Sequence, residues 1–330
     1  MPDWLKRPVL NRRQLMLAGA GAVGVTVMVQ KPGDKSGPRE SYFLDMQAAL
    51  MRAGIATPTL VIDRDRLNRN IDTLKAHLPA DMGYRIVAKS LPSLPLIAHI
   101  RDRAETDRLM TFNQPMLSAL SRDMPDADQL LGKPLPVAAA KTYFDQLPAD
   151  RAEAAGNVQW LVDTPHRLDQ YRQLARATGR PLRINLELDV GLHRGGFVPG
   201  SDLQQALQAL AEAPELSFSG FMGYEPHLPV LPSAMGWRER AKQAAWTAYR
   251  DCLGQASDVF GAAEVTQMTR NAAGSPTYRY YQDTLLANEI SAGSCLVKPT
   301  HFDTELLEPH LPASFIATPV IKSLDRTQLP

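Results

Sequence analysis

Short apolar segments alternate with segments of helical periodicity along most of this sequence, from Thr57 onward. This alternation is typical of βα units whose strands form a parallel sheet. Eight segments are predicted to be strands, at 84–88, 108–112, 127–131, 158–162, 182–188, 216–222, 264–269 and 286–290. Eight strands that alternate with helices predict an α/β fold, a (β/α)8 barrel.

The predicted strand at 182–188 indicates what fills the barrel. Its leucines and isoleucine alternate with three polar residues, Arg183, Asn185 and Glu187. Since alternate side chains of a strand point to opposite faces, we expect the apolar set to face the helices and the polar set to point inward. Two extended segments, 59–62 and 315–321, lie outside the eight strands, and we expect them to pair in a separate small β-unit.

The first 31 residues have the layout of an export signal. Basic residues up to Arg13 precede an uncharged run from Gln14 to Gln30, and the order resembles a twin-arginine signal. We expect export to the periplasm, with the segment either cleaved or kept as an anchor in the inner membrane. A buried N-terminal helix is the alternative. Residues 32–56 are expected to be a linker and entry segment. Any membrane contact is expected through the N-terminal segment alone.

The charge balance argues against a nucleic-acid partner. The 36 Lys and Arg residues nearly cancel the 35 Asp and Glu residues, the net charge is +1, and no basic run recurs. A small molecule is therefore the expected partner. The two cysteines, Cys252 and Cys295, match no metal-binding spacing. We expect two free thiols, with a single disulfide bond as the alternative.

Two loops of small residues follow the last two predicted strands, at 271–277 and 291–294. The residues that suit an anion there are Gly274, Ser275, Thr277, Gly293 and Ser294. In β/α barrels phosphate is commonly held by the loops after strands seven and eight. Glycine lets the backbone approach an oxyanion closely, and hydroxyl and N–H groups donate hydrogen bonds to it. We therefore predict a phosphate site, against the alternative of two ordinary turns.

Three other predicted strands are followed by side chains that can react or bind a ligand. Lys89 ends the first strand, where a lysine ordinarily reaches solvent. Across a barrel mouth from a phosphate site, burial and nearby cations would lower its pKa, as an amine nucleophile requires. Arg194 follows the fifth strand, and its fork suits an anionic group. After the sixth strand come Tyr224, Glu225 and His227, of which we expect Glu225 to be solvated.

These elements together resemble the fold-type III enzymes that use pyridoxal 5'-phosphate (PLP), the alanine racemase-like TIM barrels. Among these enzymes, the sequence elements resemble those of the D-threonine aldolase and D-serine dehydratase branch. The matching motifs run in family order over roughly Thr57 to Ile321. They are 57–63, 68–70, Ala88-Lys89-Ser90, 131–134, Asp189-Val190-Gly191, Arg194-Gly195-Gly196, Gly223-Tyr224, the Gly274 loop and Ala292-Gly293-Ser294.

The resemblance implies a PLP-binding barrel at 57–312 and the start of a second β-domain at 313–330. Lys89 matches the lysine that holds PLP as a Schiff base, and Arg194 matches an arginine beside the cofactor ring. Tyr224 and His227 match positions that face the pyridine or the substrate. The positions that match phosphate-holding loops are Gly274, Ser275, Thr277, Gly293 and Ser294.

The sequence departs from this family in two places. Residues 85–91 lack both histidines of the usual signature around the lysine. Full-length relatives are expected to bind a divalent metal through a His-x-Cys or His-x-Asp pair in the second domain, and neither His301 nor His310 stands in such a pair. We therefore assign no metal ligand here. Because the metal assists reaction at the β-hydroxyl, aldolase or dehydratase activity of this chain is left open.

The expected function is that of a PLP-dependent lyase, aldolase or racemase-like enzyme for small D-amino acids or β-hydroxy-D-amino acids. Its candidate catalytic residues are Lys89, His227 and Tyr224, with Lys89 or His227 as the base at the α-carbon. One alternative is a catalytically impaired protein that binds PLP or an amino acid. Another is a cofactor-free aldolase in which Lys89 attacks a carbonyl substrate. A homodimer that completes the site is left open.

Overall fold

The computed structural model describes residues 40–321. The described residues fall into two compact units, Leu60–Ala317 and the remainder on either side of it. The smaller unit contains helix α2, Ser41–Arg52, none of whose residues is buried. The predicted export signal at 1–31 lies outside the described residues, so export to the periplasm stays a prediction. Within the described part of the chain, no helix is both long enough and apolar enough to cross a bilayer.

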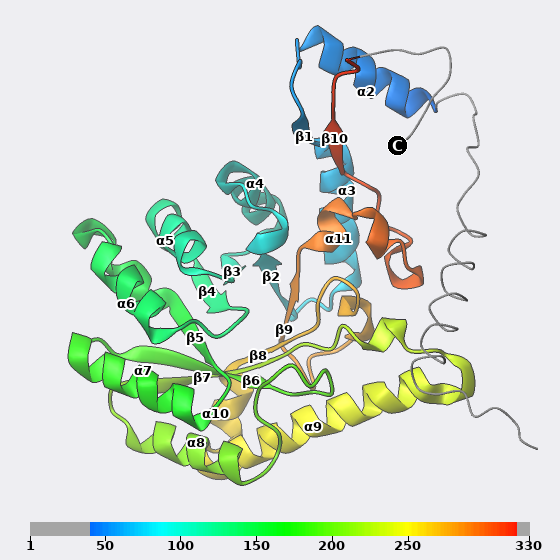
Figure 1. Cartoon of the computed structure of the whole chain (residues 1–330). Helices are drawn as coiled ribbons and strands as arrows, with labels where there is room; N and C mark the ends of the chain where they lie inside the picture. The colour runs from blue at the N-terminus through cyan, green and yellow to red at the C-terminus, as the bar shows by residue number, and fades with distance from the viewer. Residues whose placement is uncertain (1–39, 322–330) are drawn as a thin grey trace, which may run out of the picture. The chain divides into compact units, whose positions relative to one another are not determined.

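Eight parallel strands close into a barrel within Leu60–Ala317 (Figure 1). Each strand pairs with its neighbours in sequence, and the first pairs with the last. The strands are β2 Gly83–Val87, β3 Arg108–Thr111, β4 Asp128–Leu131, β5 Val158–Val162, β6 Leu182–Leu188, β7 Leu216–Gly223, β8 Thr269–Ala272 and β9 Glu289–Ala292. The predicted (β/α)8 barrel is therefore confirmed.

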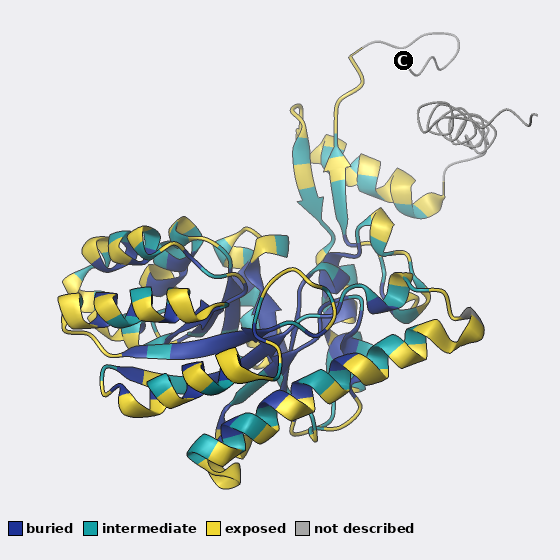
Figure 2. Ribbon diagram, turned by 60° about the horizontal axis from the view of Figure 1, so that its bottom comes forward, coloured by how far each residue is buried: buried dark blue, intermediate teal, exposed yellow. Residues whose placement is uncertain are grey.

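Helices surround the barrel, and their buried faces pack on the outer side of the strands (Figure 2). They are α3 Arg64–His77, α4 Leu94–Ala104, α5 Gln114–Asp123, α6 Val137–Gln146, α7 Pro165–Thr178, α8 Ser201–Glu212, α9 Trp237–Phe260, α10 Ala262–Gln267 and α11 Ser294–Val297. Short 3-10 segments connect them, at Ala88–Ser90, Ala149–Asn157, Leu228–Val230, Ala234–Gly236, Tyr278–Tyr280, Thr300–Phe302 and Glu305–Leu307. The first of these segments carries Lys89 immediately after β2.

The predicted bounds of the last two strands were wrong. Residues 264–269 were expected to be a strand, but most of them belong to helix α10, and β8 begins only at Thr269. The sequence of α10 is rich in Ala, Glu and Gln, which favour a helix, whereas a short apolar pattern does not distinguish a helix from a strand. The last strand begins at Glu289 instead of residue 286. Its inward side chains, Glu289 and Ser291, are polar, so an apolar pattern did not mark its bounds.

A separate two-stranded sheet joins β1, Thr59–Ile62, to β10, Ser314–Ala317. The prediction that these two extended segments pair is confirmed. The second strand ends four residues earlier than expected, at Ala317. Pro319 follows shortly after, and proline has no N–H to continue a ladder of hydrogen bonds.

The barrel interior below the site is polar, as the alternation in β6 predicted. Leu182, Ile184, Leu186 and Leu188 are buried on the outer side of β6. Inside, Arg183 donates to Asp128 (2.9 Å), and Asn185 donates to Gln159 (3.1 Å). Arg85 is almost completely buried and bonds to carboxylates of two other strands, Glu289 (2.6 Å) and Asp128 (2.7 Å). These bonds tie strands β2, β4 and β9 together from within.

Both cysteines are buried and free, Cys252 in α9 and Cys295 in α11. Burial raises the pKa of each thiol to about 12. They therefore behave as small apolar side chains of the core.

Candidate active site

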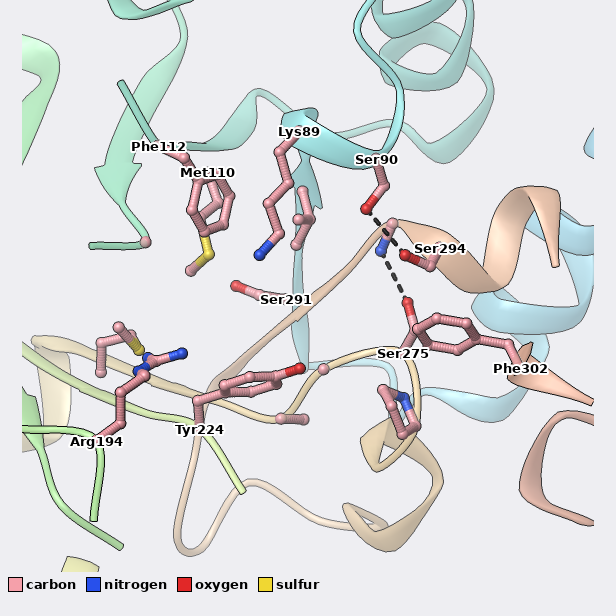
Figure 3. Close-up of a pocket in the computed structure, with 17 residues that line it drawn as sticks. Lys89, Ser90, Met110, Phe112, Arg194, Tyr224, Ser275, Ser291, Ser294 and Phe302 are labelled. Carbon is pink, nitrogen blue, oxygen red and sulfur yellow. Dashed lines mark hydrogen bonds between the residues drawn. The ribbon is translucent and has the colours of Figure 1, made fainter. Parts of the chain in front are cut away.

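A pocket of about 500 Å³ opens at the carboxyl ends of the barrel strands (Figure 3). Its polar lining consists of Lys89, Ser90, Arg194, Tyr224, Ser275, Ser291 and Ser294, and its apolar lining includes Val87, Met110, Phe112, Met222 and Phe302. Gly274 and Gly293 also line it. The structure thus brings together seven of the nine predicted site residues. His227 and Thr277 are not part of the lining.

Lys89 extends from the 3-10 turn after β2 into this pocket. Its Nζ lies 4.1 Å from the centroid of the Phe112 ring. Burial lowers the pKa of the Lys89 amine, and the positive charges of Lys133 and Arg194 lower it further. A lowered pKa leaves more of the amine unprotonated near neutral pH, which is the form that attacks a carbonyl carbon. The structure therefore places Lys89 in the pocket, in surroundings that lower the pKa of its amine.

Two glycines allow the chain to pack closely beside this amine. A Cβ on Gly274 would lie 2.4 Å from Cε2 of Tyr224, and a Cβ on Gly293 would lie 2.6 Å from the carbonyl oxygen of Val87. Both distances are shorter than atoms can approach without rearrangement. Larger residues in these loops after β8 and β9 would therefore collide with the Tyr224 ring or with the end of β2. We name the pocket-lining parts of these loops, residues 273–276 and 293–294, the anion cradle.

Serine hydroxyls hold the two loops of the anion cradle together. Ser275 Oγ accepts hydrogen bonds from the N–H groups of Gly293 (3.1 Å) and Cys295 (3.0 Å). Ser294 and Ser90 share a hydrogen bond of 2.9 Å between their hydroxyls. The Gly293 N–H, expected to serve an anion, is thus already engaged by Ser275. Figure 3 shows the hydroxyls of Ser90, Ser275 and Ser294 together on one side of Lys89.

Arg194 and Tyr224 form the wall of the pocket that faces Lys89. The Arg194 guanidinium carbon lies 5.3 Å from the centroid of the Tyr224 ring. One of its nitrogens donates to Glu187 Oε1 of β6 at 2.8 Å, which fixes the fork at the pocket mouth. Burial and, secondarily, Glu225 raise the pKa of the Tyr224 phenol. Tyr224 is therefore protonated at neutral pH and acts there as a hydrogen-bond donor.

Thr277 and Glu225 lie behind the anion cradle, and two expectations are corrected there. The Thr277 hydroxyl accepts from the Gly274 N–H (3.1 Å) and donates to Glu225 Oε1 (2.7 Å), so it supports Gly274 without lining the pocket. Glu225 was expected to be solvated, but it is 2% exposed. Its hydrogen-bond partner stands 52 residues further along the chain, so sequence reasoning had no signal for its burial.

His227 also stands outside the pocket lining. Its ring packs against Gly191, with Nε2 3.3 Å from the position that a Cβ there would take. Burial lowers the pKa of the His227 imidazole, and His193 lowers it further. The expectation that His227 is a base at the substrate is therefore not supported by its position, because a base must reach the proton that it removes.

Sequence reasoning missed several lining residues, among them Met110, Phe112, Met222 and Phe302. Three of them stand in or directly after the ends of β3 and β7. Residues at strand ends surround the mouth of a β/α barrel, so the predicted strand bounds carried this signal. Phe302 gives no such signal, since it stands in a short 3-10 segment after β9.

The described residues contain no group of three or more His, Cys, Asp and Glu side chains that could hold a metal ion. His310 is buried, and its Nε2 shares a hydrogen bond of 2.7 Å with the Tyr278 hydroxyl. Burial lowers the pKa of His310 to about 4, and the charges of Lys298 and Arg279 act in the same direction. His310 is therefore a neutral core side chain at physiological pH.

Curated proteins similar to this chain are racemases and an aldolase. The alanine racemase of Levilactobacillus brevis is 29% identical over 187 residues, which is 52% of this chain and 44% of that protein. The 3-hydroxy-D-aspartate aldolase of Paracoccus denitrificans is 23% identical over 270 residues, 79% of this chain and 65% of that protein. The chain thus spans less than half of the length of the racemase.

Solved structures show the same fold. The D-threonine aldolase from Filomicrobium marinum superposes with a TM-score of 0.66 at 18% identity, covering 79% of this chain and 68% of that one. An alanine racemase from Clostridium difficile gives 0.64 at 15% identity, covering 79% and 64%. The family model for the alanine racemase N-terminal domain matches residues 62–300, most of the barrel. The chain therefore belongs to the alanine racemase N-terminal domain family.

Proposed function

We propose that this chain binds PLP through Lys89 and acts on small D-amino acids or β-hydroxy-D-amino acids, as a lyase, an aldolase or a racemase-like enzyme. One observation carries the proposal. A lysine amine with a lowered pKa shares a pocket with a cradle of glycines and serine hydroxyls. The relatives named as racemases and D-amino-acid aldolases support the substrate class.

The pocket fits PLP because its two ends differ in chemistry. The anion cradle offers serine hydroxyls to a phosphate. Lys89 offers a nucleophilic amine to an aldehyde. Arg194 supplies a cation between them and the opening. When bound, PLP supplies an electron sink that stabilises negative charge developing at the substrate α-carbon.

The residues of the chain perform the remaining tasks. The Lys89 amine would hold the cofactor covalently, and in its free, unprotonated form it would take the proton from the substrate α-carbon. Arg194 binds an anionic group, with Glu187 fixing its orientation. Tyr224 donates a hydrogen bond from its protonated phenol. Part of the pocket lining is apolar and excludes water from the reacting atoms; it consists of Met110, Phe112 and Met222.

Borohydride trapping tests where PLP is held. The full chain is mixed with PLP, its visible absorption is recorded, and it is reduced and mapped by peptide analysis. We expect an absorption band and a label on Lys89. The band and the label should disappear in Lys89→Ala. They should persist in the matched control Lys133→Ala, because Lys133 is an exposed neighbouring lysine. A label on any other lysine, or no band, would contradict the proposal.

The reaction type is tested separately, on the PLP-loaded chain. A panel of D- and L-amino acids and of β-hydroxy-D-amino acids is assayed for racemisation, for release of an aldehyde and for release of ammonia. Inversion at the α-carbon would identify a racemase, aldehyde release an aldolase, and ammonia release a dehydratase. PLP loading without turnover of any of these would select the alternative of a binding protein.

A further inference from the structure

Glu225 is a buried carboxyl connected to the anion cradle by two hydrogen bonds. Thr277 donates to its Oε1 at 2.7 Å, and the same Thr277 hydroxyl accepts from the Gly274 N–H at 3.1 Å. Gly274 lines the pocket on the other side. The neighbouring Ser275 in turn accepts from the Gly293 N–H, so this support extends to both loops of the cradle.

The groups that face Glu225 are uncharged at neutral pH. The Ala273 N–H and the Tyr281 hydroxyl act on its carboxyl as hydrogen-bond donors, in addition to Thr277. The titratable groups packed around it from its own loop, from the loop after β8 and from α9 are tyrosines, Tyr224, Tyr280, Tyr281 and Tyr249. Beyond these rings lie the cations Arg194 and Lys242, 5.3 and 5.4 Å from the centroids of Tyr224 and Tyr280, and Arg238, which acts on Tyr280.

Burial raises the pKa of Glu225 to about 7, even though the donated hydrogen bonds from Thr277, Ala273 and Tyr281 act in the opposite direction. The carboxyl therefore exchanges its proton near neutral pH. In a buried position, where water does not screen it, its charge responds strongly to any further charge brought close.

We propose that Glu225 is a positioning residue of the anion cradle and takes up a proton when the phosphate-bearing ligand binds there. The inference rests on the proposed function, since PLP is the ligand that carries the phosphate. A phosphate on the pocket side of Gly274 repels a carboxylate on the far side, so the neutral form of Glu225 is favoured in the complex. The neutral carboxyl still bonds to Thr277, which keeps the support of Gly274 in place.

Protonation of Glu225 and binding of the phosphate are expected to favour each other. If bound phosphate raises the pKa of Glu225, protonation of Glu225 strengthens phosphate binding by the same factor. The affinity is then highest below the pKa of the ligand-free protein, falls as the pH rises through it, and levels off above the pKa of the complex. Each unit by which the ligand raises that pKa corresponds to about a tenfold change in affinity.

The test compares PLP affinity across pH in the full-length wild type and in Glu225→Gln. Affinity is measured by absorbance titration from about pH 6 to about pH 9, a range that brackets the pKa of Glu225. Titration of PLP itself and of Lys89 affects both proteins equally, so the ratio of the two affinities isolates Glu225. We expect this ratio to change about tenfold across the range. The control Glu212→Gln removes an exposed carboxyl at the end of α8 and should follow the wild type.

The outcomes separate this inference from the proposed function. If the wild type binds PLP and Glu225→Gln follows the same pH profile, the inference is wrong and the proposed function stands. If the wild type binds no PLP at any pH, both are overturned. Should Glu225→Gln fail to fold, Tyr281→Phe provides the test. It removes one donor to the carboxylate, so the midpoint of the pH profile should move upward. An unchanged midpoint would overturn the inference.

Discussion

At the scale of single residues, the site depends on side chains that are small as much as on those that react. Lys89, Arg194 and Tyr224 supply polar groups to the pocket lining, and Gly274 and Gly293 allow the chain to pack closely beside them. Several other glycines of the described chain lie in open surroundings. Gly156, for example, has no atom within 4 Å of the position of an added Cβ.

Gly274→Ala should therefore weaken PLP binding without unfolding the barrel. The added Cβ would lie 2.4 Å from the Tyr224 ring, so either the ring or the loop must move into the pocket. Overpacking of this kind costs about 1–3 kcal/mol, which corresponds to a loss of affinity of about fivefold to about 150-fold. Absorbance titration with PLP measures the affinity, and Gly156→Ala is the matched control. Equal affinities in the two variants would show that Gly274 is not part of the ligand's space.

At the scale of elements, glycines have opposite effects in strand β7 and in helix α9. Gly220 pairs with Thr269 of β8, has a φ of +133°, and lies where the β6–β7 register shifts. A Cβ there would lie 1.9 Å from the Thr269 carbonyl oxygen. Gly254 lies within α9 and has no atom within 4 Å of the position of an added Cβ. The barrel needs glycine at the first position, and the helix does not need it at the second.

We expect Gly220→Ala to destabilise the barrel and Gly254→Ala to stabilise it. The first combines a strained φ with a clash against the backbone of β8, and should lower the free energy of unfolding by more than about 2 kcal/mol. The second removes backbone freedom from the unfolded chain and should raise it by about 0.5–1 kcal/mol. Urea unfolding of both variants measures these changes. An unchanged free energy of unfolding in Gly220→Ala would contradict this account, because it would show that strand β7 can relax at this position.

At the scale of the whole molecule, a buried charge network links strands that are far apart in sequence. Arg85 of β2 bonds to Glu289 of β9 and Asp128 of β4, and Asn271 of β8 also donates to Glu289 (2.7 Å). Asn271 reaches Ser291 at the floor of the pocket (2.8 Å). The polar interior therefore extends from the amino ends of the strands to the candidate site.

Arg85→Met should destabilise the protein by about 3–5 kcal/mol, because it leaves Glu289 and Asp128 with fewer partners in a buried setting. The double variant Arg85→Met, Glu289→Gln should recover part of this loss, since one buried charge is removed with the other. The matched control is Arg101→Met, which breaks a pair of the same 2.7 Å length with the exposed Asp126. That pair should contribute less than about 1 kcal/mol. Similar losses in the two single variants by urea unfolding would contradict this account.

The sequence by itself determined the class of fold and the positions of most of the predicted residues that line the pocket. Alternating apolar patterns gave eight strands because the period of a strand and of a helix is a local property of the chain. Lys89, Arg194 and the small residues around Gly274 and Gly293 were found because strand ends and small-residue loops are also local features. Strand β6 even showed which side chains point inward.

Only the tertiary structure decided which of these residues meet. Glu225 and Thr277 are separated by 52 residues and form one hydrogen bond, so neither the burial of the first nor the supporting role of the second is visible locally. His227 follows Tyr224 closely in sequence, yet only Tyr224 lines the pocket. The burial of a side chain and its hydrogen-bond partners depend on which distant parts of the chain pack around it. A local pattern that repeats every two or four residues does not contain this information.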